Sequence, residues 1–278
     1  MERFVADMRR YWEQRPFIWF ENSKRSGLSP SPPSRARVLI LGPHPDDPES
    51  AAVTIRLLMN SGCELFYAIA CMSPEGVDDE YALNQHDMEG LSLLDRKIEI
   101  RRREQKQSAQ LVGIASERLT FLEIKKSGNE NLLDTSENRL KIRSYLEFLM
   151  PDIIITPAGK DTNQTHVWVC SIMRQCIRDL SVNSGKPMVA LYNEDPKTTE
   201  IRTDLFVLFG EKSALWKKSL LKIHDSQQQR NISRQQKGFD ERILRVNLEG
   251  YEKLLQFTPL AIGKDRYAEV FEIEIFDH

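Results

Sequence analysis

Side chains suited to metal chemistry gather in the short segment Pro43–Asp47 (PHPDD). Imidazole and carboxylate groups are normal zinc ligands, and a catalytic zinc site uses three protein ligands and a water molecule. The spacing of His44 and Asp47 lets one turn direct both side chains toward one ion. Asp46, which lies between them, must then point elsewhere. This suits a carboxylate that handles the proton of a metal-bound water.

A third ligand is expected from a second loop, and His166 has the position that this ligand needs. It begins a predicted helix after a loop that itself follows an apolar run. His86 lies in a polar stretch, His224 lies late in a predicted amphipathic helix, and His278 is the last residue. The third ligand is therefore expected to be His166.

A simpler interpretation of the first segment involves no metal. Asp46 and Asp47 would cap the following helix, as aspartate commonly does, and His44 would be a surface imidazole. The His-Pro-Asp-Asp stretch alone leaves the two interpretations balanced. A strand before it, a helix after it and a second histidine-bearing loop favour the metal site.

Apolar runs alternate with helical patterns from Arg37 onward. Val38–Leu41 is a continuous apolar run, typical of a strand that is buried on both faces. Further strands are expected at 64–72, 119–122, 152–156, 188–192, 205–208 and 269–276, and helices at 51–61, 92–112, 138–150, 166–180, 212–225 and 241–256. This alternation implies parallel pairing. We predict an α/β fold with a Rossmann-like, doubly wound and mostly parallel sheet flanked by helices, in a single domain over residues 37–278.

Two loops are expected to meet at one edge of this sheet. They are residues 43–50 after the first strand and residues 157–165 after the fourth. In doubly wound sheets, ligands bind beyond the carboxyl ends of the strands. The predicted metal site requires this convergence.

Residues 1–36 are predicted to form an N-terminal arm and a linker outside that domain. The first 25 residues are aromatic-rich and permit a helix, whereas residues 26–34 (SGLSPSPPS) are too rich in serine and proline for one. We expect the arm to pack on the main domain or on a neighbouring subunit. Its interleaved tryptophan and arginine residues leave a membrane-surface anchor as an alternative.

The overall composition carries no broad charge signal. A formal net charge of −2 gives no electrostatic footprint for nucleic acid. Four cysteines without a Cys-x-x-Cys pair fit reduced thiols. The sequence has neither an apolar run of the ~18–20 residues that a membrane span needs nor a signal-peptide pattern. We expect a cytoplasmic protein without nucleic-acid partners or membrane association. The sequence does not decide whether the chain forms a homo-oligomer.

Four stretches resemble motifs of the PIG-L/LmbE family of zinc-dependent deacetylases, which includes N-acetylglucosaminyl deacetylases. They are an opening strand and metal loop at 38–49 (VLILGPHPDDPE), an Arg-x-x-Glu helix with its Val-Gly end at 101–113, a histidine-delivering loop at 157–166 (PAGKDTNQTH) and a C-terminal motif at 267–271 (YAEVF). The resemblance covers residues 37–273. It implies the removal of an N-acetyl group from an amino sugar or its conjugate, a small-molecule substrate.

The resemblance also implies roles at the matching positions of the metal loop. His44, Asp47 and His166 would bind Zn²⁺, whose bound water attacks the amide. Asp46 would act as the general base and would then protonate the departing amine. Glu49 would orient a ligand or cap the helix.

Two further residues are expected at the substrate-binding face. The resemblance places Arg101 there, with Glu104 beside it to steady it. Both belong to a charged run (RKIEIRRRE, residues 96–104), for which a solvated helix face is the alternative.

The sequence departs from the family pattern at two places. Asn163 occupies a position where some relatives carry a histidine. Asparagine can donate a hydrogen bond to an oxyanion but cannot shuttle a proton. Residues 122–125 (LEIK) lack the aspartate that many members carry after the third strand. The sugar and its aglycone therefore stay open, and residues 76–90 are the candidate wall or lid that selects them.

Two other kinds of protein are weighed against the hydrolase. A Rossmann-type nucleotide-binding protein would carry Gly-x-Gly-x-x-Gly after the first strand, but Gly42 stands alone there. A catalytically weak or silent relative would serve as a binding subunit. The intact set of candidate ligands argues against it, whereas Asn163 argues for it.

Overall fold

The computed structural model of the chain describes residues 1–21, 29–125, 133–258 and 265–277. Its strands form one sheet in the order β1-β7-β8-β6-β5-β2-β3-β4. They are β1 (Phe17–Phe20), β2 (Arg37–Gly42), β3 (Glu64–Ile69), β4 (Leu119–Phe121), β5 (Ile153–Pro157), β6 (Met188–Asn193), β7 (Leu205–Phe209) and β8 (Tyr267–Phe276). All neighbouring pairs are parallel except those of β8 with β6 and β7. The predicted α/β class and mostly parallel sheet are confirmed.

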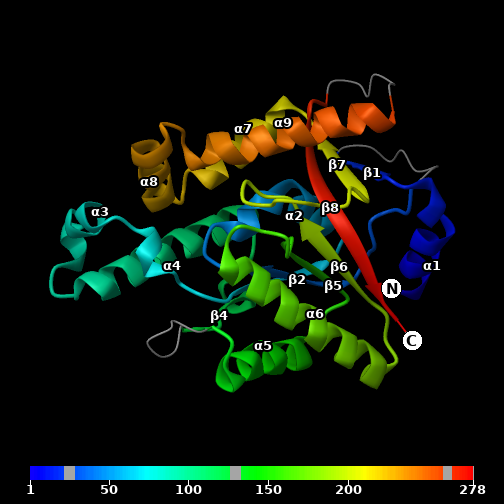
Figure 1. Cartoon of the computed structure of the whole chain (residues 1–278), viewed down its shortest axis with the longest axis horizontal. Helices are drawn as coiled ribbons and strands as arrows, with labels where there is room; N and C mark the ends of the chain where they lie inside the picture. Colours follow the sequence, from blue (N-terminus) through cyan, green and yellow to red (C-terminus); the bar gives the residue numbers. More distant parts are fainter. Residues whose placement is uncertain (22–28, 126–132, 259–264, 278) are drawn as a thin grey trace.

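Helices flank this sheet (Figure 1). They are α1 (Glu2–Arg10), α2 (Ala52–Asn60), α3 (Asp79–Leu83), α4 (Leu93–Val112), α5 (Ser136–Leu149), α6 (Gln164–Ser184), α7 (Glu211–Leu221), α8 (Asp225–Gln235) and α9 (Phe239–Phe257). In the part of the chain that the structure describes, none of them combines the length and the apolar content that crossing a membrane demands.

Strand β2 shows why the first apolar run has no polar alternation. Val38 and Ile40 belong to a core with α1, α2, α4 and α7, whereas Leu39 and Leu41 belong to a core with α5 and α6. Successive side chains of a strand point to opposite faces, so a strand between two helical layers must be apolar throughout.

The carboxyl ends of three neighbouring parallel strands carry the loops that hold the candidate site. Strand β2 pairs with β5, and β5 pairs with β6, all in parallel. The loops after β2 and β5 therefore meet at one edge, as predicted, and the loop after β6 joins them.

Helix α2, which follows the metal loop, is anchored by a residue of the C-terminal strand. Glu269 of β8 accepts hydrogen bonds from the backbone N–H groups of Val53 (2.9 Å) and Thr54 (2.7 Å). Lys217 of α7, fully buried, contacts the same carboxylate at 2.6 Å. Free N–H groups at a helix start favour an anion. The Tyr-Ala-Glu motif thus stabilises the element behind the site.

Two elements differ from the sequence-based expectation. Phe17–Phe20, in the segment expected to form an arm, is a strand that pairs with β7, because its aromatic and β-branched side chains suit a sheet edge. The helix expected over 212–225 ends at Leu221, and a new helix begins at Asp225. Residues 26–28 of the expected linker lie outside the described residues.

Candidate metal site

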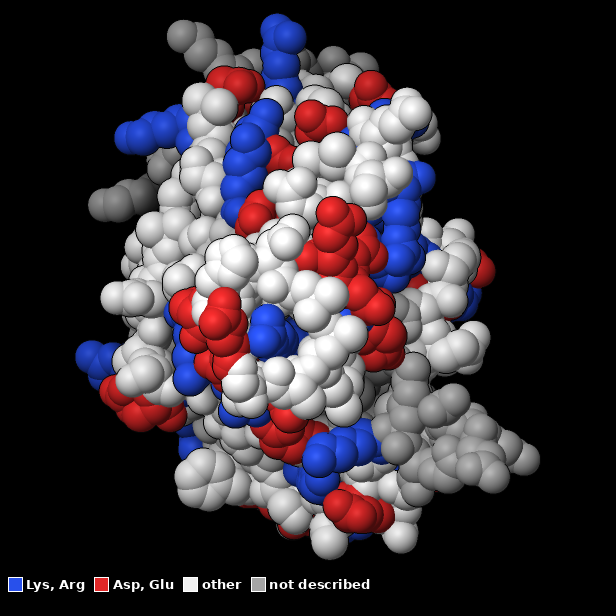
Figure 2. Space-filling model, turned by 90° about the vertical axis from the view of Figure 1, so that its left-hand side faces the viewer, with Lys and Arg blue, Asp and Glu red and all other residues white. Residues whose placement is uncertain are grey.

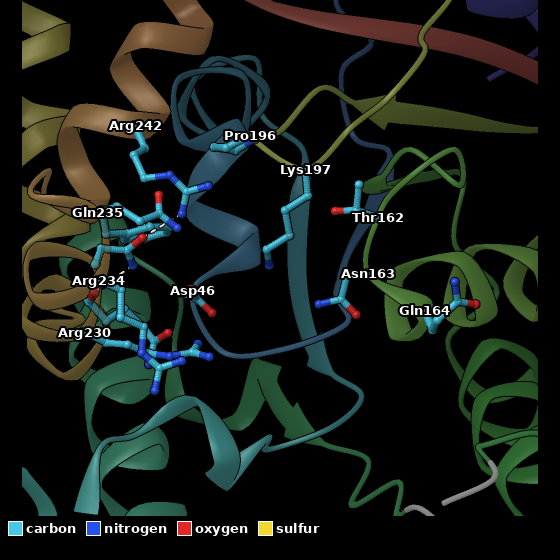
Figure 3. Close-up of a pocket in the computed structure, with 13 residues that line it drawn as sticks. Asp46, Thr162, Asn163, Gln164, Pro196, Lys197, Arg230, Arg234, Gln235 and Arg242 are labelled. Carbon is cyan, nitrogen blue, oxygen red and sulfur yellow. Dashed lines mark hydrogen bonds between the residues drawn. The ribbon is translucent and has the colours of Figure 1, made fainter.

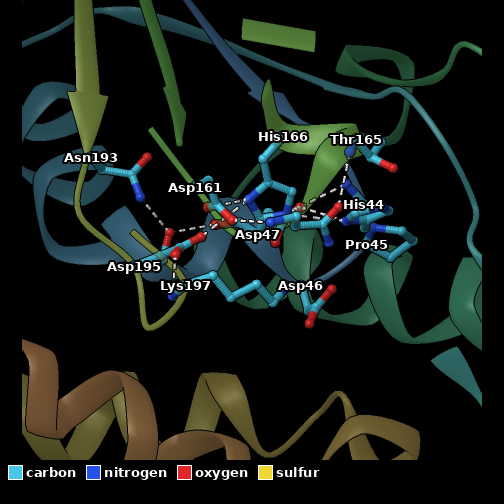
Figure 4. Close-up of polar contacts among 12 residues, drawn as sticks. His44, Pro45, Asp46, Asp47, Asp161, Thr165, His166, Asn193, Asp195 and Lys197 are labelled. Atoms are coloured by element: carbon cyan, nitrogen blue, oxygen red, sulfur yellow. Dashed lines mark hydrogen bonds and ion pairs between the residues drawn. The ribbon is translucent and has the colours of Figure 1, made fainter. Parts of the chain in front are cut away.

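The structure brings the three predicted metal ligands together at the edge between β2 and β5 (Figure 4). Asp47 Oδ2 lies 3.2 Å from His44 Nδ1 and 3.3 Å from His166 Nε2. The two imidazole nitrogens are 3.3 Å apart. All three residues are buried. The two histidines are 122 positions apart in the sequence, so only the fold unites them.

These separations fit a zinc ion. Zinc-to-ligand bonds of roughly 2.0–2.1 Å in tetrahedral geometry place neighbouring ligand atoms about 3.3 Å apart. Two imidazoles and one carboxylate also match the three-ligand set of catalytic zinc sites. The cluster could therefore hold a metal ion of this size.

The second ring nitrogen of His166 is held by two carboxylates. His166 Nδ1 lies 2.9 Å from Asp161 Oδ2 and 3.3 Å from Asp195 Oδ2. A carboxylate on one nitrogen of a histidine fixes the ring so that the other nitrogen faces the metal. Asp161, His166 and Asp195 form a second possible metal group. Neither aspartate lines the cavities that reach His44 and Asp46.

The surrounding charges favour a cation at the cluster. Burial opposes a charged His166, but Asp47, Asp161 and Asp195 outweigh it and raise its pKa to about 12. Burial alone would raise the pKa of Asp47, yet the two neighbouring histidines hold it well below its usual range. Burial lowers the pKa of His44, which keeps that imidazole neutral. A neutral imidazole beside ionised carboxylates can bind a metal ion directly.

Asp46 lies next to the ligand cluster but does not belong to it (Figure 4). Its backbone has φ 92°, a left-handed conformation that costs a residue with a side chain about 1–3 kcal/mol. Two contacts from α4 hold it there. Its N–H donates to Gln105 Oε1 (3.0 Å), and its Oδ1 accepts from Arg101 Nη2 (2.8 Å). No hydrogen bond among the described residues engages Oδ2.

The two α4 residues expected at the substrate face have different positions. Arg101 is buried, contacts Asp46 and the carbonyl of Pro45, and lines the cavity over the metal cluster. Glu104 is not brought to that cavity. Its carboxylate accepts hydrogen bonds from the backbone N–H (2.7 Å) and hydroxyl (2.8 Å) of Ser226, at the start of α8. Helix α4 therefore joins the metal loop to α8.

Asn163 caps the helix that carries His166. Its Oδ1 accepts a hydrogen bond from the backbone N–H of Thr165 at 2.9 Å. The side-chain NH₂ of Asn163 is then left to face the space beside Asp46, as Figure 3 shows. An amide NH₂ group in this orientation can donate a hydrogen bond into the cavity.

Sequence reasoning placed His224 in a helix away from the site, and the structure corrects this. Because the chain turns at 222–224, His224 occupies the position just before α8 and lies fully buried beneath the metal loop. Its Nε2 is 3.4 Å from Glu49 Oε2, while Gln105 and Ser108 donate to Glu49 Oε1. Burial opposes charge on both partners, but their attraction raises the pKa of His224 and lowers that of Glu49.

Two adjoining cavities lead to this cluster. The smaller, about 170 Å³, reaches His44. The larger, about 620 Å³, lies between the loops after β5 and β6 and helices α8 and α9 (Figure 3). Five residues line both: Asp46, Asn163, Lys197, Gln227 and Arg230. Of residues 76–90, the candidate wall, Gly76 lines the smaller cavity. The contribution of α8 and α9 to the lining of the larger cavity was not predicted, although the spacing of Arg230 and Arg234 places both on one face of a helix.

The family of the chain follows from its sequence. The family model described as PIG-L, GlcNAc-PI de-N-acetylase, matches residues 39–177, half of the chain. The chain therefore belongs to the PIG-L family, as its four motifs indicated. No curated protein sequence matches it significantly.

Solved structures share the fold at low sequence identity. N,N′-diacetylchitobiose deacetylase from Pyrococcus horikoshii is 19% identical, with a TM-score of 0.63 over 86% of this chain and 84% of that one. The 4-carboxy-2-hydroxymuconate hydratase GalB from Pseudomonas putida is 16% identical, with a TM-score of 0.63 over 86% and 95%. A deacetylase of teicoplanin biosynthesis is 15% identical, with a TM-score of 0.55 over 86% and 98%. The same fold occurs in deacetylases and in a hydratase, so the reaction must be argued from the site.

Proposed function

We propose that this chain is a zinc-dependent hydrolase that removes the N-acetyl group from an amino sugar or its conjugate. The observation that carries the proposal is the position of Asp46. It stands beside the three converging candidate ligands, outside their cluster, and lines both cavities. A carboxylate in that position can exchange protons with a water and with a leaving group. Membership of a de-N-acetylase family supports the same chemistry.

The ligand cluster would supply the electrophilic part of the reaction. His44, Asp47 and His166 would hold the zinc ion, which lowers the pKa of a bound water toward about 7 and polarises a carbonyl group. Asp161 and Asp195 would keep the His166 ring in the orientation that this requires.

Proton transfer falls to Asp46. Arg101 binds its Oδ1 and leaves Oδ2 to accept the proton of the attacking water. The same oxygen would then pass that proton to the departing amine nitrogen. Asn163 would donate its NH₂ to the acetamide oxygen as negative charge develops there. Both side chains line the smaller cavity above His44.

The test combines metal analysis with a turnover assay. Purified protein loaded with zinc is incubated with a panel of N-acetylated amino sugars, and free amine is detected. We expect about one zinc per chain and amine release from at least one substrate. Asp46→Asn should keep the zinc and lower kcat by about 10²- to 10⁴-fold. Asp87→Asn, at an exposed position, is the matched control.

Two results would overturn the proposal. Protein that neither contains nor takes up zinc would remove the metal chemistry. An Asp46→Asn variant that releases amine at the parent rate would remove the general base. Zinc-loaded protein that is inactive on the whole panel would favour the silent relative as a binding subunit.

A further inference from the structure

Helix α4 has a charged surface and a buried polar face. On the surface, Lys97 and Arg103 pair with acidic residues of the segment before the helix. Figure 2, which views the molecule from the side of α3 and α8, shows Lys and Arg side chains interspersed with Asp and Glu side chains. Arg101, Gln105 and Ser108 are buried instead, and their helical spacing places them on one face. That face contacts the metal loop.

The amide of Gln105 contacts the metal loop at two points. Its Oε1 accepts a hydrogen bond from the backbone N–H of Asp46 at 3.0 Å, and its Nε2 donates to Glu49 Oε1 at 3.0 Å. The side chain is fully buried. Glutamine suits this place because one planar group carries both an acceptor and a donor. An apolar side chain would leave both partners with an unmet hydrogen bond, which is costly in a buried place.

Glu49 determines which way round this amide lies. A carboxylate only accepts hydrogen bonds, so the NH₂ of Gln105 must face Glu49 and its carbonyl oxygen must face Asp46. Glu49 is itself held from two other elements. Ser108 of α4 donates to its Oε1, and His224 Nε2, just before α8, lies 3.4 Å from its Oε2. The buried contacts of the fold therefore fix the direction of the amide.

Asp46 needs such a support because of its backbone. Its φ of 92° lies in the left-handed region, which is unfavourable for a residue with a side chain and persists only where the surroundings enforce it. His44 and Asp47 contribute to the ligand cluster, whereas Asp46 stays outside it (Figure 4). Arg101 binds the carboxylate of Asp46, and Gln105 binds its backbone N–H. The contact from Gln105 is the one that bears on the strained backbone.

We infer that Gln105 is a positioning residue, which holds Asp46 in the left-handed conformation that keeps its carboxylate out of the ligand cluster and at the cavity. The inference rests on the proposed function, in which Asp46 is the general base. Asp46 lines both cavities, whereas Gln105 lines neither. Gln105 therefore acts on the reaction through Asp46 and not through a contact with the substrate.

Steady-state kinetics of Gln105→Met separate positioning from substrate binding. Methionine has a similar length and volume but makes neither hydrogen bond. We expect kcat to fall about 10²-fold, because a displacement of about 1 Å from the productive geometry has an effect of that size. KM should stay within about twofold of the parent value. Gln110→Met, an exposed position on the same helix, is the matched control and should change neither constant.

A double-mutant cycle shows whether Gln105 acts through Asp46. The Asp46→Asn variant has no base left to position, so adding Gln105→Met should change its kcat by less than about twofold. If Gln105 served only the packing of α4, the second change would lower kcat by the same factor in both backgrounds, which would overturn the inference. Val112→Ala, in the core on the same helix, should lower the melting temperature and leave kcat unchanged.

Crystal structures of the parent and of Gln105→Met give a readout that needs no turnover. Asp46 should leave the left-handed region in the variant, while His44, Asp47 and His166 still bind about one zinc per chain. If thermal melting shows that Gln105→Met is unstable, Gln105→Leu replaces it, with the same expected results. An Asp46 that keeps a φ near 92° in the variant would overturn the inference.

The two proposals fail in different ways. If the chain is no deacetylase, the parent and every variant release no amine, yet Asp46 still changes its backbone conformation in Gln105→Met. If Gln105 does not position Asp46, the parent and Gln105→Met release amine with the same kcat, and the conformation of Asp46 is the same in both structures.

Discussion

The two sides of the cavity are built in different ways. On the metal side, His44, Asp47 and His166 are buried, and their ring and carboxylate atoms contact one another within 3.3 Å. On the other side, Arg230 and Arg242 are half-buried and have no ion-pair partner among the described residues. One side is complete without a substrate, whereas the other has unused hydrogen-bond donors.

This difference indicates a division of labour. Chemistry requires groups fixed within fractions of an ångström, which loops between central strands and packed helices supply. Recognition can use groups whose contacts are completed by the ligand. Under the proposed function, the cavity joins a rigid reactive end, built from the family motifs, to a recognition end formed by this chain's later helices.

The largest effect is expected when the metal side loses a ligand. His166→Ala removes one of three ligand groups and the partner of Asp161 and Asp195. Metal content should fall from about one zinc per chain to near zero, and amine release should fall to background. Inductively coupled plasma mass spectrometry of dialysed protein measures the first effect.

The control for this change is His86→Ala, since His86 is an exposed histidine. It should leave the zinc content unchanged. If His166→Ala retains stoichiometric zinc, the ligand set is different from the one proposed.

A smaller effect on metal binding is expected when a residue that orients a metal ligand is changed. Asp161→Asn leaves the three ligands in place but weakens the hold on His166 Nδ1. Metal affinity should fall by about 10- to 100-fold. Competition with a zinc chelator measures this loss, and Asp179→Asn, exposed on the same helix α6, is the control. An unchanged affinity would show that Asp195 alone orients the ring.

The fold of the metal side could be predicted because its signals are local. Continuous apolar runs mark the buried strands β2 and β5, and parallel strands bring their loops to one edge. Strand β1 was missed because a run of four aromatic and aliphatic residues is too short for its periodicity to distinguish a strand from a helix. The pairing of β1 with β7, which lies about 190 positions later, decided between them.

The candidate site, likewise, could be predicted only where its signals are local in the sequence. His44 and Asp47 share one motif, and His166 begins the helix after a matching loop. Asp195 also follows a buried strand, β6, and this polar residue at the carboxyl end was a usable signal. The placement of His224 beneath the metal loop could not be predicted, because it depends on how α8 packs against α4.

The smallest effect is expected at Glu104, which links the two sides. Burial raises its pKa above the ordinary value of 4.5. A carboxyl group with a raised folded-state pKa contributes stability that is fully present below pH 4.5 and is lost as the pH rises through the folded pKa. The side chain of the Glu104→Gln variant stays neutral at every pH. Its amide can still accept a hydrogen bond from the Ser226 N–H and donate one to the Ser226 hydroxyl.

The free energy of unfolding of the parent, relative to that of Glu104→Gln, should therefore decrease between pH 4.5 and pH 7. Urea denaturation at both pH values measures the difference, and Glu89→Gln, at an exposed position, should show no such trend. Zinc content should be unchanged. A relative stability that rises with pH would mean that the charged carboxylate stabilises the start of α8, because a helix N-terminus favours an anion. A constant relative stability would mean that folding does not raise the pKa of Glu104.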